Sequence, residues 1–270
     1  MKKRILSSII MAIILVPLFL KGGIVFTLGV YFISLLALKE FLDMKNTKKG
    51  LPEFINFISY MMLTLLIFFN VSGEHSKEIP ALTMDFRVIA GLFLTFLIPT
   101  VLYHDRKKYS INDAFYLIGG IFFLGTSVSL FILFREREFA LLIYLLLITI
   151  FTDTYAFLTG LLIGKHKLLE EISPKKTWEG TLGGTIFAVF VAVSFYHTVI
   201  NPETSIWSLT LITTFLSFLG QLGDLFFSAI KRYYGKKDFS NIIPGHGGIL
   251  DRLDSIIFVV LGYVFFISIL

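Results

Sequence analysis

Residues 207–254 read WSLTLITTFLSFLGQLGDLFFSAIKRYYGKKDFSNIIPGHGGILDRLD. The segment 207–230 is mostly apolar and carries one charge, Asp224, and a second mostly apolar run occupies 249–270. A run of about 20 such residues is long enough to cross a bilayer as a helix. Between the runs lie cationic side chains and a Pro-Gly-His-Gly-Gly turn, and the tetrad Asp-Arg-Leu-Asp opens the second run. The stretch therefore predicts two membrane helices and a loop with the groups needed to hold a metal-bound polyphosphate.

The whole chain has the composition of a membrane protein. Of its 270 residues, 56% are hydrophobic, 16% are charged and 30 are Phe, whereas about 25% of the residues of soluble domains are charged. The chain has no Cys, which excludes disulfides and thiolate metal sites. In a membrane protein the net charge of +5 is a signal of topology, and we expect no nucleic-acid partner.

Nine apolar runs are long enough to be considered spanning helices. The predicted fold is therefore all-α, a polytopic integral membrane protein with about nine transmembrane helices. No A-x-A-like cleavage site follows the first run, so we expect a retained helix there, in a hairpin with the second run across Lys21, Gly22 and Gly23. The sequence leaves open whether both of these runs span. The nine runs lie at 5–20, 24–42, 54–71, 86–103, 113–134, 139–162, 180–200, 207–230 and 249–270.

Basic residues alternate between the predicted loops and indicate an orientation. With a cytoplasmic N-terminus, the inside segments hold eighteen Lys and Arg residues and the outside segments hold five. We therefore expect the N-terminus and the segment 231–248 on the cytoplasmic side of the cell (inner) membrane. Residues 1–112 contain few candidates for catalytic or binding residues and are predicted to be a scaffold of transmembrane helices. Residues 113–270 are predicted to carry the functional cytoplasmic loops.

Several acids lie within the apolar runs. An acid inside a membrane span costs about 2.5–3.5 kcal/mol and is a functional hypothesis by default. Asp251 and Asp254 are three residues apart and so project from one face of a helix. For a single acid, a buried ion pair is an equal alternative, for instance Asp251 with Lys231 or Arg252. For the whole set beneath two basic loops, Mg²⁺ binding is the better interpretation, because this cation prefers carboxylate oxygens. The set comprises Asp153, Asp224, Asp251 and Asp254.

The second basic loop, 164–180, reads GKHKLLEEISPKKTWEG. It packs hydroxyls, a proline and two ammonium groups into 173–177, directly before a predicted helix N-terminus, where phosphate groups are favoured. Such a loop is usually a plain connector, but here a loop of matching chemistry is predicted on the same face. Gly-x-x-x-Gly spacings at Gly160/Gly164 and Gly180/Gly184 would permit close helix approach, although such matches are common by chance.

The motif residues together resemble the signature of the phosphatidate cytidylyltransferases, also called CDP-diacylglycerol synthases. The pattern is S-x-x-K-R-x4-K-D, then P-G-H-G-G-x-x-D-R-x-D, with S-P-K-K-T-x-E-G at 173–180 and an acid at 153 upstream. The resemblance covers about the last 120 residues. It implies the reaction of CTP with phosphatidate to give CDP-diacylglycerol and diphosphate, a requirement for Mg²⁺, and an integral-membrane homodimer that acts early in phospholipid biosynthesis. The pattern is filled by Ser228, Lys231, Arg232, Lys237, Asp238, Pro244, Gly245, His246, Gly247, Gly248, Asp251, Arg252 and Asp254.

The reaction implied by the resemblance suggests a role for each group of residues. Asp224 and Asp251 are predicted to hold Mg²⁺, with Asp254 assisting and with a second cation left open. Loop 173–177 is predicted to bind CTP phosphates, and the cations of 231–237 to neutralise the phosphatidate headgroup or the leaving diphosphate. The predicted catalytic residues are Asp224, Asp251, Lys237, Asp238, His246, Arg252 and Asp254. The predicted substrate-binding residues are Asp153, Ser173, Lys175, Lys176, Thr177, Glu179, Ser228, Lys231, Arg232, Gly245, Gly247 and Gly248.

Other functions remain compatible with parts of this pattern. A CTP-dependent lipid kinase, or a cytidylyltransferase for another lipid phosphate, would share the basic loops and the acids. A transporter or channel would also carry intramembrane acids, but here the polar residues cluster at one end of the predicted helices. A catalytically silent scaffold does not account for so dense a set of acids.

Overall fold

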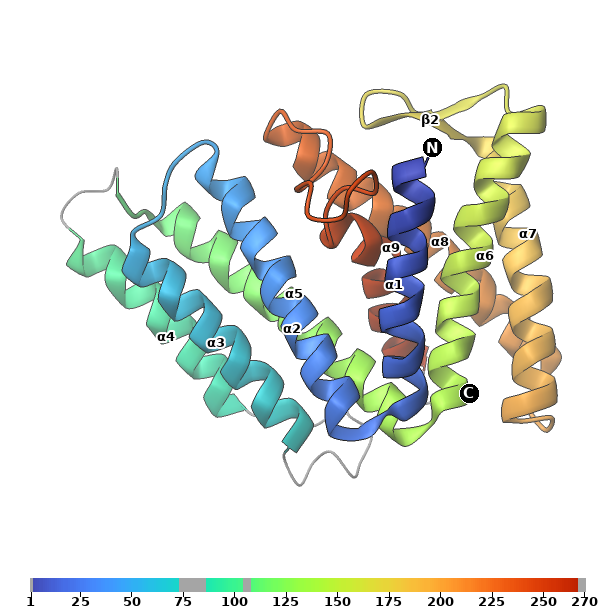
Figure 1. The fold of residues 1–270 in the computed structure, drawn as a ribbon, viewed down its shortest axis with the longest axis horizontal. Coiled ribbons are helices and arrows are strands. Elements are labelled where there is room, and N and C mark those ends of the chain that lie inside the picture. Colours follow the sequence, from blue (N-terminus) through green and yellow to red (C-terminus); the bar gives the residue numbers. More distant parts are fainter. Residues whose placement is uncertain (1, 73–85, 104–107, 267–270) are drawn as a thin grey trace. The chain divides into compact units, whose positions relative to one another are not determined.

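The computed structural model describes residues 2–72, 86–103 and 108–266 (Figure 1). These residues form nine α-helices, one π-helical turn and one two-stranded sheet. The segments 73–85 and 104–107, on which two of the predicted loops fall, lie outside the described residues. The elements are α1 (Lys2–Lys21), α2 (Gly23–Asn46), α3 (Glu53–Ser72), α4 (Phe86–Leu102), α5 (Ile111–Arg137), α6 (Phe139–Ile163), β1 (Lys167–Leu169), β2 (Ser173–Thr177), α7 (Trp178–Phe195), η3 (Tyr196–Ile200), α8 (Ile206–Tyr233) and α9 (Leu250–Phe266).

The helices confirm the prediction of an all-α polytopic membrane protein. In the described residues, each of the nine predicted apolar runs overlaps with one α-helix, and the run 180–200 continues from α7 into η3. Within the described residues, six helices are long and apolar enough to cross a membrane, namely α2, α3, α5, α6, α7 together with η3, and α8. α1, α4 and α9 are not among these six helices. The total of nine membrane-spanning helices therefore stays a prediction.

The chain divides into two compact units. The first unit comprises Met1–Glu136 and Asp238–Leu250, and the second comprises Arg137–Lys237 and Asp251–Leu270. The charged segment between α8 and α9 is thus shared, since its first part belongs to the second unit and residues 238–250 belong to the first.

In the first unit, α1 and α2 form the predicted hairpin (Figure 1). Gly22 and Gly23 have φ angles of 62° and 58°, a left-handed conformation that glycine adopts without steric cost. Two charged side chains from the end of α5 hold this turn. Arg135 Nε donates a hydrogen bond to Phe19 O at 2.7 Å, and Glu136 Oε1 accepts one from Gly23 N at 2.8 Å.

In the first unit, α2 and α5 touch at a stacked pair of rings and at a buried charge cluster. The rings of Phe41 and Tyr116 stack with their centroids 4.4 Å apart, and a Cβ at Gly120 would lie 2.1 Å from Phe41. Near the same ends of the two helices, buried Asp113 accepts ion pairs from Lys45 and Lys49, both at 2.6 Å. A charge-neutralised carboxylate therefore joins α2 to α5.

In the second unit, α6 and α7 approach so closely that glycines of α7 face backbone atoms of α6. A Cβ at Gly184 would lie 2.5 Å from Thr152 O, and one at Gly180 would lie 2.6 Å from Ala156 O. Small residues let membrane helices pack backbone to backbone. The Gly-x-x-x-Gly spacing at 180 and 184, a weak signal in the sequence, thus belongs to a real interface.

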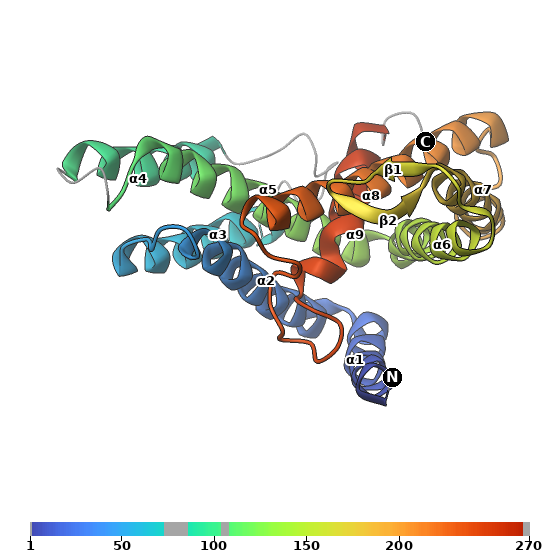
Figure 2. The same cartoon turned by 90° about the horizontal axis from the view of Figure 1, so that it is seen from above.

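The loop between α6 and α7 contains the β-hairpin, which the sequence did not predict (Figure 2). β1 and β2 pair antiparallel, with Lys167 opposite Thr177 and Leu169 opposite Ser173. Lys167 Nζ also donates to Pro174 O at 2.6 Å. β2 runs directly into α7, where the Thr177 hydroxyl accepts a hydrogen bond from Gly180 N and caps the helix. The predicted phosphate-binding loop is therefore an ordered element at the helix N-terminus.

Candidate active site

The first cluster of predicted site residues joins the hairpin to α8. Lys176 Nζ lies 2.7 Å from Asp224 Oδ2, and the two side chains are 23% and 30% exposed. Ser228, one turn further along α8, donates a hydrogen bond to Asp224 Oδ1 at 3.3 Å. Lys176 also donates to Gln221 O. The structure thus pairs one ammonium group of the SPKKT loop with the acid of α8.

A second ion pair joins α8 to α9. Lys231 Nζ lies 2.6 Å from Asp251 Oδ1, and both side chains are almost completely buried. This is the ion pair that the sequence left open as an alternative for Asp251. Removing two charges from water is costly, and mutual attraction offsets that cost only with good geometry. The ion pair is compatible with a role in binding. The ammonium of Lys231 could bind an anionic ligand, and the carboxylate of Asp251 could bind a cation.

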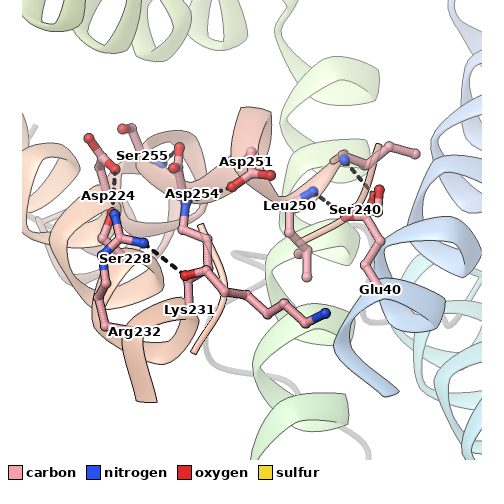
Figure 3. Close-up of polar contacts among 12 residues, drawn as sticks. Glu40, Asp224, Ser228, Lys231, Arg232, Ser240, Leu250, Asp251, Asp254 and Ser255 are labelled. Atoms are coloured by element: carbon pink, nitrogen blue, oxygen red, sulfur yellow. Dashed lines mark hydrogen bonds and ion pairs between the residues drawn. The ribbon is translucent and has the colours of Figure 1, made fainter. Parts of the chain in front are cut away.

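Asp254 is a second buried acid of α9, beside Asp251. It is 8% exposed, and the charges of Asp224 and Asp153 both act on it. The close approach of α8 and α9 explains why these acids meet, since a Cβ at Gly223 would lie 2.6 Å from Asp254 O. Figure 3 shows Asp224, Asp254 and Asp251 following one another across these two helices. Asp153 lies on α6 with an exposed side chain.

The carboxylate oxygens of these acids suit a hard divalent cation, although the acids do not form a complete metal site by themselves. Among the described residues, no group of three or more His, Asp or Glu side chains is placed to hold a metal ion. Asp224 and Asp251 each have a lysine partner instead. Carboxylates that repel one another gain from a cation between them, and Mg²⁺ needs only one or two protein carboxylates when phosphate oxygens complete its shell. The residues therefore fit Mg²⁺ bound together with a polyphosphate.

A buried polar network below these acids was missed in the sequence. Ser217 and Thr152 share a hydrogen bond of 2.8 Å, and Ser217 donates to Thr185 Oγ1 at 3.1 Å. Gln221 Nε2 donates to Thr185 Oγ1 and to Thr181 O. Hydroxyls are common in apolar runs, so only the packing of α6, α7 and α8 reveals the network. It fixes the segment of α8 that precedes Asp224.

The remaining residues of the hairpin and of the end of α8 are more open to solvent. Glu179 accepts hydrogen bonds from the backbone N–H of His166 and lies 2.6 Å from its Nδ1, so it fastens the hairpin to the first turn of α7. Arg232 donates to Lys236 O at 2.8 Å. Ser173 is half-buried, and the exposed predicted residues of this unit are Asp153, Lys175, Arg232, Lys237 and Arg252.

The glycine-rich turn belongs to the first unit. Gly245 and Gly247 have φ angles of 80° and 85°, and Ile243 N donates to Gly247 O at 2.9 Å. The ring of His246 lies against α1, with Nδ1 2.7 Å from Ser7 Oγ and Nε2 3.3 Å from Ser8 Oγ. Asp238, at the start of the segment, is exposed. The predicted site residues therefore belong to both units, with 238–248 in the first and the acids and lysines of α8 and α9 in the second.

Glu40 is a further buried acid and is not among the predicted site residues. Its side chain is 1% exposed and accepts hydrogen bonds from Ser240, Ile249 and Leu250. The sequence indicates a buried role for Glu40 only by placing an acid in the mostly apolar segment 37–42, which reads ALKEFL. Its partners lie about 200 residues away and two of them are backbone groups, so their identity could not be read from the pattern.

The fold and the cluster define a class of protein, namely a polytopic membrane enzyme whose buried acids and lysines are suited to a metal-bound phosphate ligand. Comparison with known proteins narrows this class. The model of the cytidylyltransferase family matches residues 2–270, so the chain belongs to this family. A phosphatidate cytidylyltransferase of Staphylococcus epidermidis is 36% identical over 261 residues, covering 96% of each chain. Those of Staphylococcus haemolyticus and Staphylococcus aureus are also 36% identical, with 96% coverage of each chain.

Proposed function

We propose that this protein is a CTP:phosphatidate cytidylyltransferase, which makes CDP-diacylglycerol from CTP and phosphatidate in phospholipid biosynthesis. The observation that carries the proposal is the family membership over residues 2–270, together with relatives of that name aligned over 96% of the chain. The acid and lysine cluster of α8 and α9 supports it, because both substrates are anionic phosphates. The likeness extends through the N-terminal helices, which carry no part of the signature.

The chemistry requires one phosphorus–oxygen bond to form and one to break. An oxygen of the phosphatidate phosphomonoester attacks the α-phosphorus of CTP, and the bond to the β-phosphate breaks as diphosphate leaves. The attacking phosphate is already ionised at neutral pH, so no protein base or nucleophile is needed. Catalysis then depends on bringing two anions together and neutralising the charge that the leaving group gains.

The lysines are suited to that task. In our proposal Lys176, supported by Lys175, binds phosphates of CTP, and Ser173 and Thr177 shape the loop at the N-terminus of α7. Lys231, Arg232 and Lys237 neutralise the lipid headgroup or the departing diphosphate. The ammonium groups of Lys176 and Lys231 form ion pairs with Asp224 and Asp251. We therefore assign these two cations the positions nearest to the reacting phosphates.

The acids are assigned to a divalent cation. Asp224 and Asp251, with Asp254 assisting, would hold Mg²⁺, and a second cation could share this set of carboxylates. When bound, Mg²⁺ supplies charge neutralisation of the triphosphate and orients its α-phosphorus. The protein residues themselves hold the triphosphate oxygens in place and keep the carboxylates at the correct depth.

We also propose a topology, a division of roles along the chain and an oligomeric state. The chain crosses the membrane about nine times with its N-terminus in the cytoplasm, and the hairpin and the segment 231–248 face the cytoplasm of the cell (inner) membrane. Residues 1–112 serve as scaffold and 113–270 carry the catalytic loops. The enzyme is a homodimer. The excess of Lys and Arg in the inside segments supports this orientation.

The proposal is tested by incubating the purified protein in detergent micelles with CTP, Mg²⁺ and phosphatidate. The expected products are CDP-diacylglycerol and diphosphate in equal amounts. A cytidylyltransferase for another lipid phosphate would form a CDP-lipid only when its own acceptor is supplied. Nucleotide-independent ion flux in proteoliposomes, without any CDP-lipid, would favour a transporter and contradict the proposal.

A further inference from the structure

Glu40 is a buried acid that the proposed chemistry does not use. Its Oε1 accepts hydrogen bonds from Ser240 Oγ at 2.5 Å and from Ile249 N at 2.8 Å, and its Oε2 accepts one from Leu250 N at 2.8 Å. Figure 3 shows the side chain reaching from α2 towards Ser240 and Leu250. Charge-assisted hydrogen bonds of this kind are stronger than neutral ones. One carboxylate thus ties together both ends of the segment 240–250.

The residues just before Leu250 offer no capping side chain to the helix that starts there. The first N–H groups of a helix lack partners within the helix, and a Ser, Thr, Asp or Asn just before the helix usually accepts from them. Here the preceding residues are Gly248 and Ile249, which have no such atom. Glu40 supplies the acceptor from another helix, and its negative charge is also favourable at a helix N-terminus.

The same carboxylate explains the last glycine of the signature turn. A Cβ at Gly248 would lie 2.7 Å from both Oε1 and Oε2 of Glu40, which is closer than such atoms can approach. Gly248 does not have a positive φ, unlike Gly245 and Gly247. Its need for glycine therefore comes from the space that the Glu40 carboxylate occupies.

We propose that Glu40 is a positioning residue for the reaction. It fixes the turn 240–250 and the first amides of α9, and so sets where the helix that carries Asp251 and Asp254 begins. The inference rests on the proposed function, because Asp251 directly follows Leu250 in the chain and is assigned there to the metal-bound nucleotide. In this proposal Glu40 acts through the Ser240 hydroxyl and the amides of Ile249 and Leu250, and not on the substrate itself.

The first test measures hydrogen exchange of the segment 240–250 in the Glu40→Gln variant. Glutamine has the same shape but only one acceptor oxygen, so at least one of the amides of Ile249 and Leu250 faces an NH₂ group. We expect exchange of these amides to become about tenfold faster or more. Asp43→Asn, which changes an exposed acid on the same helix, serves as the matched control and should leave exchange unchanged. Unchanged exchange in Glu40→Gln would overturn the proposal.

The second test separates positioning from a general structural role. In Glu40→Gln, kcat should fall by about 10-fold to 100-fold, and the Mg²⁺ concentration for half-maximal activity should rise severalfold. A merely structural role would reduce the amount of active enzyme and leave that concentration unchanged, which would refute positioning.

A second variant keeps the test decisive if Glu40→Gln does not fold. Gly248→Ala displaces the carboxylate from the opposite side and should produce the same two changes; wild-type exchange and Mg²⁺ response in this variant would refute the inference. Wild-type protein that makes no CDP-lipid would contradict the proposed function, whereas the exchange result would still decide whether Glu40 holds the turn.

Discussion

The buried ion pair between Lys231 and Asp251 offers a way to separate stability from catalysis. Replacing Asp251 by Leu removes one partner and leaves the ammonium of Lys231, which is 6% exposed, without its carboxylate at 2.6 Å. Replacing both residues, in Lys231→Met/Asp251→Leu, removes both charges and keeps similar side-chain volumes. The two variants differ in whether the ammonium of Lys231 is left inside the protein without the Asp251 carboxylate.

The expected magnitudes follow from the burial of both groups. Removing one partner of a buried pair destabilises a protein by about 3–5 kcal/mol, whereas replacing both by apolar residues is often neutral. At roughly 2–4 °C per kcal/mol for a chain of this size, the single variant should lose on the order of 6–20 °C in its apparent midpoint of thermal unfolding. The double variant should recover most of that loss.

The assay combines thermal unfolding in detergent micelles with formation of CDP-diacylglycerol at a temperature where the variants are folded. Both variants should be inactive, because Asp251 is assigned to the metal-bound nucleotide. Glu203→Gln, at an exposed acid of the same unit, is the control and should match the wild type in both measurements. A double variant that is both stable and active would refute the assignment of Asp251, and a single variant as stable as the wild type would refute the energetic argument.

Three further predictions concern other parts of the structure. Lys176→Met should change stability by only about 0–1 kcal/mol, since its pair with Asp224 is partly exposed, but should raise the KM for CTP by about tenfold or more; an unchanged KM in steady-state kinetics would remove Lys176 from the nucleotide site. Gly184→Leu should prevent folding of the α6–α7 seam, where a Cβ would lie 2.5 Å from a carbonyl oxygen, whereas Gly119→Ala has open space and should behave as wild type in expression and gel filtration. Since the chain has no Cys, Lys236→Cys should react with a membrane-impermeant maleimide only in inside-out vesicles and Glu203→Cys only in intact cells; the reverse pattern would refute the proposed orientation.

The helices could be predicted from the sequence because each apolar run is long and is bounded by charged or glycine-rich segments. The turn at Gly22 and Gly23, for instance, was visible as an interruption between two such runs, and its positive φ angles agree. The β-hairpin was not visible, because its strands are short and β2 is mostly polar with a proline. Its pairing depends on α7, whose first turn it joins through Thr177.

The acids of the candidate site could be recognised because a carboxylate in an apolar run is costly. Their partners could not, since which lysine reaches which acid depends on how α8 packs against α9 and against the hairpin. Lys231 and Asp251 were foreseen only as one alternative, and the pairing of Lys176 with Asp224 was not foreseen. Glu40 is the clearest case of a partner that the sequence could not reveal. Two of its hydrogen-bond donors are backbone amides about 200 residues away, and every residue type except proline has such an amide.

The most direct test of the central claim follows the two ends of the CTP triphosphate with separate labels. Wild-type protein is given CTP labelled at the α-phosphate or at the γ-phosphate, together with Mg²⁺ and phosphatidate, and the lipid and aqueous phases are counted. We predict that the α-label enters the lipid in equal amount to the γ-label released as diphosphate, and that Asp224→Asn abolishes both. Transfer of the γ-label to the lipid, with CDP left free, would show a lipid kinase and contradict the account.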